Sequence, residues 1–161
     1  MARIVDRLVN EKCDYSPIDF EVTRFITESH LSRSGKQLQP KKSPSLPGMK
    51  RAKETLYFER NARALAIAAQ ALARETKDLV IAVLFRDADG THSSGRGLWE
   101  NKRDSIVRGF DKEGFSSGVP MVPKPKSEAW LLCAVKSTPY QHCKTLENES
   151  GNDNSTNPLK K

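Results

Sequence analysis

The chain has 161 residues and a formal net charge of +7, from 27 lysines and arginines against 20 aspartates and glutamates. Its length suits one domain with a buried core. No apolar run is long enough to cross a bilayer and no signal peptide is recognisable, so we expect a cytoplasmic protein without membrane contact. The basic surplus favours nucleic acid as a partner. Because no Cys-x-x-Cys spacing occurs, reduced thiols are expected at all three cysteines: Cys13, Cys133 and Cys143.

The first part of the chain predicts a helix, a strand and a loop. Apolar residues at helical spacing predict the helix over 2–10. Alternating apolar and polar residues predict the strand over 18–26. Glycines and prolines predict the loop over 32–48, which also carries Lys41 and Lys42. This loop is either a solvated connection or a basic flap over a polyanion.

The middle of the chain predicts a long helix followed by a buried strand. Alanine, leucine, arginine and glutamate favour the helix over 49–75. The uninterrupted apolar run Leu79–Phe85 predicts a central parallel strand that is covered on both faces. A helix over 98–110 and a strand over 118–122 are expected next. The long helix is expected to bury one stripe: Leu65, Ala68, Ala69 and Leu72.

The last predicted helix begins near Ser127, and its core residues are expected to be Trp130, Leu131 and Leu132. Residues 138–161 are polar and are expected to form a flexible tail. Helices and strands therefore alternate along residues 1–137. This alternation predicts one α/β domain, with a mostly parallel sheet flanked by helices.

Two carboxylates, Asp87 and Asp89, come directly after the predicted central strand. In parallel sheets, ligands bind at the carboxyl ends of the strands. Two adjacent acids repel each other there, and a divalent cation such as Mg²⁺ or Mn²⁺ relieves the repulsion. The alternative is a simple turn at Asp89-Gly90, with Arg86 as the counter-charge. We expect a metal site at the two aspartates.

Three further side chains are candidates for the same site. Glu128 lies at the start of a predicted helix, where it either interacts with the helix dipole or joins the site. Arg96 and Arg103 either contact phosphate groups, together with Lys41 and Lys42, or belong to a solvated surface.

Several segments together resemble DUF4276, a family of unknown function related to TOPRIM domains. The more specific likeness is a Pro-x-x-Glu-x-Trp-Leu-Leu-like ending, here Pro125 and Glu128 onward, after a strand with Asp-x-Asp. The resemblance implies a TOPRIM-like fold in which Asp87 and Asp89 hold Mg²⁺. The segments are Leu79–Gly90, the helix with Trp99, Val119–Pro125 and Ser127–Leu132.

TOPRIM domains also carry a glutamate at the end of a first strand, which precedes the first helix. By this resemblance the chain begins inside that helix and lacks the strand. Glu11 is the stand-in that the sequence offers, although it follows a helix. The domain is thus expected to be incomplete at its N-terminus.

The resemblance implies a nuclease-like domain acting on nucleic-acid phosphodiesters, with Asp87, Asp89 and Glu128 as catalytic residues. It also implies a partner ATPase and a role in defence against phages, by analogy with related nucleases. As an alternative, Leu84–Thr91 resembles the first motif of the haloacid dehalogenase superfamily, which would make Asp87 the nucleophile and Asp89 the acid or base of a phosphatase. Another alternative is a non-catalytic module that binds nucleic acid or a protein.

Overall fold

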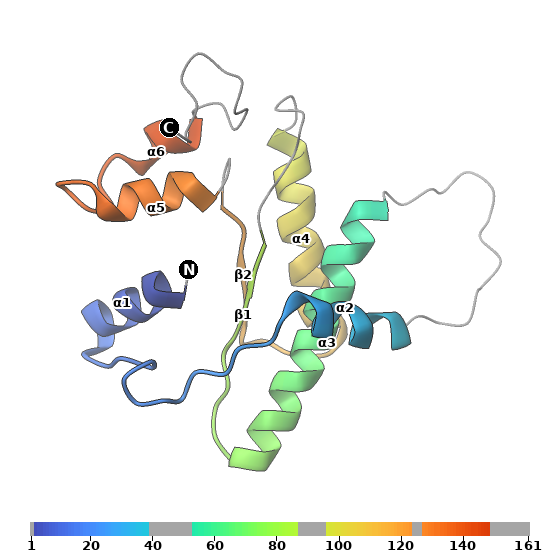
Figure 1. Ribbon diagram of the computed structural model, residues 1–161. Helices are drawn as coiled ribbons and strands as arrows, with labels where there is room; N and C mark the ends of the chain where they lie inside the picture. Colours follow the sequence, from blue (N-terminus) through green and yellow to red (C-terminus); the bar gives the residue numbers. More distant parts are fainter. Residues whose placement is uncertain (1, 39–52, 87–95, 124–126, 149–161) are drawn as a thin grey trace.

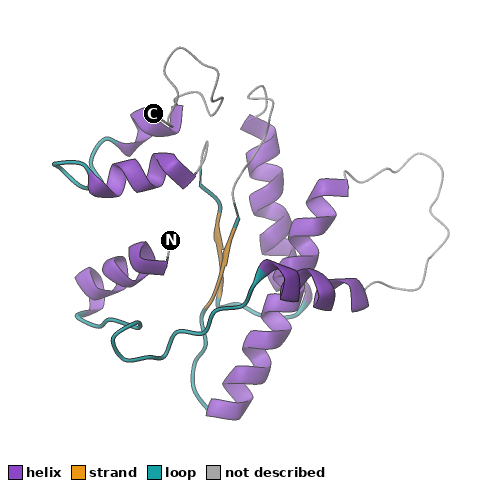
Figure 2. Ribbon diagram, viewed as in Figure 1, coloured by secondary structure: helices purple, strands orange, loops and turns teal. Residues whose placement is uncertain are grey.

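The computed structural model describes residues 2–38, 53–86, 96–123 and 127–148. These residues form a mixed α/β structure that is mostly helical and contains a small parallel sheet (Figures 1 and 2), which confirms the predicted class in its coarse form. Within these ranges, no helix has the length and apolar character needed to cross a membrane. The elements are α1 (Ala2–Cys13), α2 (Glu28–Gln37), α3 (Lys53–Thr76), β1 (Ala82–Phe85), α4 (Arg96–Lys112), β2 (Gly118–Met121), α5 (Ser127–Val135) and α6 (Cys143–Asn148).

A β1-α4-β2 unit is the centre of the fold. The two strands pair in parallel, with Ala82 opposite Gly118 and Phe85 opposite Met121. Parallel neighbours need a long crossover, which α4 supplies. The carboxyl ends of both strands therefore lie at one edge of the sheet, where the sequence predicts the site.

Helices α3 and α4 pack closely because small residues meet at their contact. A Cβ atom on Gly109 would lie 2.5 Å from the carbonyl oxygen of Glu59 and 2.6 Å from Cβ of Ala62. Ile106 and Ala62 are fully buried there. The buried stripe of α3 differs from the predicted one, because only Ala69 of the four predicted residues is buried. The stripe is Phe58, Ala62, Ala66 and Ala69.

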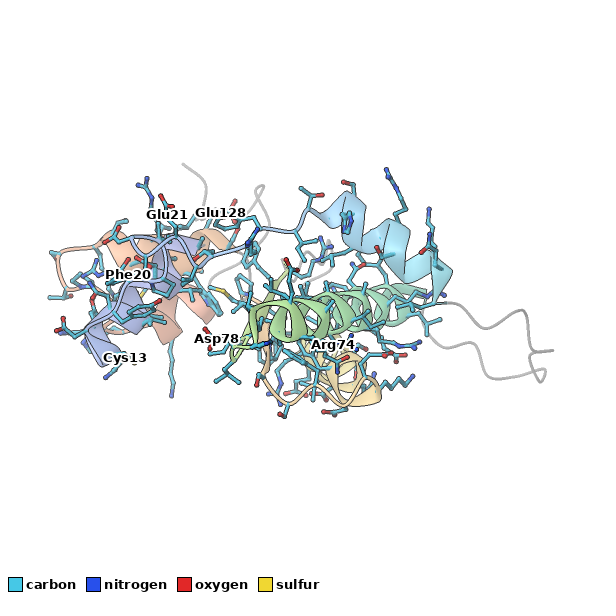
Figure 3. All side chains as sticks on the ribbon, turned by 90° about the horizontal axis from the view of Figure 1, so that it is seen from below. Cys13, Phe20, Glu21, Arg74, Asp78 and Glu128 are labelled. Atoms are coloured by element: carbon cyan, nitrogen blue, oxygen red, sulfur yellow. A yellow bond between two sulfur atoms is a disulfide. The ribbon has the colours of Figure 1, made fainter. Side chains whose placement is uncertain are left out.

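The sheet is covered on one face, not on both. Ala82 and Leu84 are buried against the helices, whereas the side chains between and before them face outward. Exposure is 37% for Val83, 63% for Ile81 and 78% for Leu79. Figure 3 shows α2, α3 and α4 on one side of the molecule and α1 and α5 on the other. The continuous apolar run therefore does not mark a strand buried on both faces, at least among the described residues.

The strand predicted over residues 18–26 is wrong, because local hydrogen bonds turn the backbone instead. Asp6 on α1 accepts hydrogen bonds from the Ser16 hydroxyl at 2.9 Å and from the Ile18 amide at 3.0 Å. The Val22 amide donates to the Pro17 carbonyl at 3.1 Å, and Glu21 has a φ of 55°. These donors are used within the turn and are not free for a sheet.

The loop predicted from residue 32 is also wrong over its first part, which belongs to α2. Thr27 caps this helix, because its side-chain oxygen accepts a hydrogen bond from the His30 amide. Leu31 is buried, and Gly35 lies against α3, where a Cβ would be 3.3 Å from Cβ of Arg60. Tertiary packing thus stabilises a helix in a segment that contains glycine.

The α5–α6 region contradicts the prediction of reduced cysteines. Cys133 and Cys143 form a disulfide with Cα atoms 5.6 Å apart, whereas Cys13 is free and exposed. The disulfide joins α5 to α6, a helix inside the predicted polar tail. The predicted core residues Leu131 and Leu132 are 43% and 40% exposed.

Helix α1 contacts this region through a cation–π interaction. The Arg7 guanidinium lies 5.4 Å from the ring centroid of Tyr140, in the α5–α6 connection. The predicted helix over 2–10 is confirmed, although no residue of α1 is fully buried.

Candidate functional site

The candidate site lies at the carboxyl end of β1, where Arg86 follows the strand. The Arg86 amide donates to the Met121 carbonyl at 3.0 Å, so its backbone continues the pairing with β2. Its side chain is only 14% exposed. An arginine that is nearly buried at a strand end needs an acidic or aromatic neighbour.

The neighbours of Arg86 come from α2 and α3. Its Nη1 atom lies 2.8 Å from Oε2 of Glu28, in the first turn of α2. The guanidinium also lies 5.4 Å from the ring centroid of Tyr57, on α3. The Tyr57 hydroxyl donates to Oε1 of Glu28. Each of the three side chains therefore contacts the other two.

This cluster keeps Glu28 ionised. The Tyr57 hydroxyl, followed by the Arg86 guanidinium, holds the pKa of Glu28 below its ordinary value. Burial acts in the opposite direction but is weaker, because the side chain is 60% exposed. At neutral pH the cluster thus presents a charged carboxylate beside a charged guanidinium.

One edge of the Arg86 guanidinium is not used by the described residues. Nη1 is paired with Glu28, whereas Nε and Nη2 are buried and have no hydrogen-bond partner in the described part of the chain. A buried donor without a partner costs about 1–3 kcal/mol. The arrangement therefore favours an acceptor at this edge.

A second cation lies near the same aromatic residues. Lys102 on α4 is 3% exposed, and its Nζ atom lies 5.7 Å from the ring centroid of Phe58. The rings of Phe58 and Tyr57 meet edge to face with centroids 6.0 Å apart. Lys102, which is buried, and Arg86, which is nearly buried, thus lie over neighbouring rings on α3.

Most of the predicted site residues lie outside the described ranges. This holds for Asp87, Asp89, Lys41 and Lys42. Arg96 begins α4, but its side chain is not described.

The two remaining predicted residues are described. The Arg103 guanidinium lies 5.8 Å from the ring centroid of Trp99 and 3.5 Å from Asp104, and its side chain is half exposed. Glu128 lies in the first turn of α5, and the Ser127 hydroxyl is 3.4 Å from its Oε2 atom. The first-turn position fits both roles that the sequence left open for Glu128.

Sequence reasoning missed Glu28 and Tyr57. Thr27 followed by an acid is a recognised helix start and could have revealed α2. The pairing of Glu28 with Arg86 has no recognisable signal in the sequence, because it depends on how α2 packs on α3. Glu11, the stand-in from the sequence, instead pairs with Arg7 on α1 at 2.8 Å and is exposed.

The described donors do not make a metal site by themselves. Within the described ranges, no three histidine, cysteine or acidic side chains come close enough to hold a metal ion. Glu28 supplies one ionised carboxylate at the correct end of β1. With two more carboxylates the donor set would be all oxygen, which is what Mg²⁺ and Mn²⁺ prefer.

Comparison of the chain with protein-family models, with curated proteins and with solved structures gives no match. The site must therefore be interpreted from its own residues.

Proposed function

We propose that this protein is a TOPRIM-like, Mg²⁺-dependent domain that acts on the phosphodiester bonds of nucleic acid. The observation that supports this is the Glu28–Arg86 ion pair at 2.8 Å. It brings a carboxylate from α2 to the residue that directly precedes Asp87. Glu28 is thus a better candidate than Glu11 for the glutamate that TOPRIM domains require.

In this proposal Glu28, Asp87 and Asp89 hold the metal ion. Their carboxylate oxygens suit Mg²⁺, which when bound would polarise a phosphoryl oxygen. Tyr57 orients the Glu28 carboxylate through its hydroxyl, and Arg86 balances part of the negative charge. Glu128 follows the neighbouring strand β2 and is the fourth acidic candidate at this edge of the sheet.

The net charge of +7 supports nucleic acid as the substrate class. Arg96, Arg103, Lys41 and Lys42 are proposed to contact phosphates. A partner ATPase and a role in phage defence rest on family analogy alone. We place the protein in the cytoplasm, where the Cys133–Cys143 bond would respond to the redox state.

The first test is metal binding, measured by titration calorimetry with Mn²⁺ at moderate salt. The Asp87→Ala/Asp89→Ala double variant should lose binding, because both ligands are removed. Glu28→Gln should bind at least about tenfold more weakly. Asp78→Asn is the matched control, since Asp78 precedes the amino end of β1 and Arg86 follows its carboxyl end. It should bind as the wild type does.

Equal binding by the wild type and the double variant would contradict the metal site. Where binding is lost as expected, Mg²⁺-dependent cleavage of labelled DNA and RNA by the purified wild type is the second test. The absence of cleavage would leave a metal-binding domain without nuclease activity of its own.

One observation favours a second candidate, a non-catalytic module that binds nucleic acid. Arg86 already supplies a positive charge to Glu28, so this carboxylate does not need a metal ion. This candidate predicts salt-sensitive DNA binding that persists in the Asp87→Ala/Asp89→Ala variant. Metal-dependent cleavage by the wild type would exclude it.

A further inference from the structure

The Nε and Nη2 donors of Arg86, which have no partner among the described residues, have a defined arrangement. Nε and Nη2 lie on the same side of the planar group and point their N–H bonds in parallel. This edge is one of the two that bind carboxylates and phosphates with two hydrogen bonds. Both atoms are buried, and neither has a partner among the described residues. The geometry therefore fits a single oxyanion with two acceptor oxygens.

Three contacts hold the guanidinium in place. Glu28 binds Nη1 at 2.8 Å, and the Tyr57 ring lies 5.4 Å from the guanidinium carbon. The Arg86 backbone is bonded to β2 through the Met121 carbonyl. A donor pair that is already oriented loses little side-chain entropy when it binds an anion. Glu28 and Tyr57 thus act as positioning residues for Arg86.

The charge of the guanidinium and of the whole chain favours phosphate as the anion. Buried Lys102 adds a second cation beside Phe58, whose ring adjoins that of Tyr57. Glu28 pairs with Nη1 of Arg86 and leaves the Nε/Nη2 edge open. The net charge of +7 on the whole chain favours a polyanion as the source of the phosphate. A bound phosphate would satisfy both free donors of Arg86.

We propose that the Nε/Nη2 edge of Arg86 binds a phosphate group of a nucleic-acid strand and thereby positions that strand at the carboxyl end of β1. This inference rests on the proposed function for its choice of nucleic acid. It does not require a metal ion or a catalytic step, so it can be tested separately.

The test is binding without metal, in the presence of a chelator. The probes are a short single-stranded oligodeoxynucleotide and inorganic phosphate. The side-chain Nε–H signal of Arg86 in the wild type, followed by ¹⁵N NMR, should shift when the oligodeoxynucleotide is added. Arg86→Lys keeps the charge but loses the two-donor edge, and should bind about tenfold more weakly.

Arg74→Lys is the matched control. Arg74 is an exposed arginine near the end of α3, and its Nε donates to the Gln70 carbonyl. This variant should bind the oligodeoxynucleotide as the wild type does. Thermal unfolding of both variants checks that they fold, and the wild-type NMR signal tests the inference even where Arg86→Lys does not fold.

An Nε–H signal that does not move with either probe would overturn the inference. So would a signal that instead shifts in Asp87→Ala, because the chain's own carboxylate would then fill the edge. A shift with inorganic phosphate alone would overturn the assignment to nucleic acid. Binding that depends on Arg86 without any Mg²⁺-dependent cleavage would support this inference while contradicting the proposed nuclease activity.

Discussion

The chemistry of single residues at this site depends on a contact between distant parts of the sequence. Glu28 begins α2, Tyr57 lies on α3 and Arg86 ends β1, yet the three side chains touch. An ion pair that is largely exposed on the acidic side contributes little stability. The ion pair instead orients the two groups, because it fixes the carboxylate and the guanidinium relative to each other at the carboxyl end of β1.

The ion pair makes stability depend on pH in a defined direction. The pKa of Glu28 is lowered in the folded state, so its contribution is present above the unfolded value and is lost as the pH falls through the folded value. Relative to Glu28→Gln, the wild type should be more stable by about 0.5–1 kcal/mol near neutral pH, and the difference should disappear as the pH falls below the lowered pKa of Glu28. Urea unfolding at several pH values measures this.

Tyr57→Phe is the companion variant, since it keeps the ring under Arg86 and removes only the hydroxyl. In this variant the pKa of Glu28 should rise toward its ordinary value, as followed by NMR titration of the carboxyl carbon. A pKa that does not change would show that the hydroxyl has no role in keeping Glu28 ionised.

At the scale of elements, packing between helices decides more than local propensity does. The α3–α4 contact depends on Gly109, which lies against the backbone of Glu59. The turn after α1 depends on Asp6, which collects hydrogen bonds from Ser16 and Ile18. Neither role can be read from propensity, because glycine is unfavourable inside a helix and Asp6 acts on residues beyond its own helix.

Gly109→Ala should destabilise the protein by about 1–3 kcal/mol, because the new Cβ would meet the α3 backbone. In a solvent-exposed helix the same change stabilises by up to about 1 kcal/mol, so the sign of the effect tests the contact. Asn101→Ala, at an exposed position of α4, is the control and should be neutral or slightly stabilising. Denaturant unfolding of the two variants gives the comparison.

Asp6→Ala should loosen the turn between α1 and α2 without unfolding the α3–α4 core. The Ser16 hydroxyl and the Ile18 amide both lose their acceptor, the Asp6 carboxylate, at a cost of about 1–2 kcal/mol. Hydrogen exchange of the Ile18 amide should become faster, while that of Ile106 should not change. Equal exchange of Ile18 in the wild type and the variant would contradict the assignment.

For the whole molecule, the sequence predicts the order of the central strands and helices along the chain. It does not predict which face of the sheet is covered by other elements. Length, alternation and the apolar run after the long helix predicted the parallel strands β1 and β2 and the crossover α4, because these signals are local. The exposed face of β1 was not predictable, since an apolar residue such as Val83 looks the same in the sequence whether or not another element covers it.

Only the location of the candidate site, and not the residues around it, could be predicted from the sequence. The position of the carboxyl end of β1 follows from strand order, so the sequence could point to this edge of the sheet. Glu28 could not be found, because its role arises from the packing of α2 on α3. The disulfide was missed because Cys133 and Cys143 come together only through the turn between α5 and α6.

The disulfide also has a practical consequence for limited digestion of this protein. Lys136 lies between the two bonded cysteines and is followed by Ser137, so trypsin has a cleavage site inside the closed loop. A cut there would leave the two fragments covalently joined, and the band would keep its position on a non-reducing gel. The C-terminal piece would separate only after a reductant is added, so the same cut would be invisible in one gel and obvious in the other.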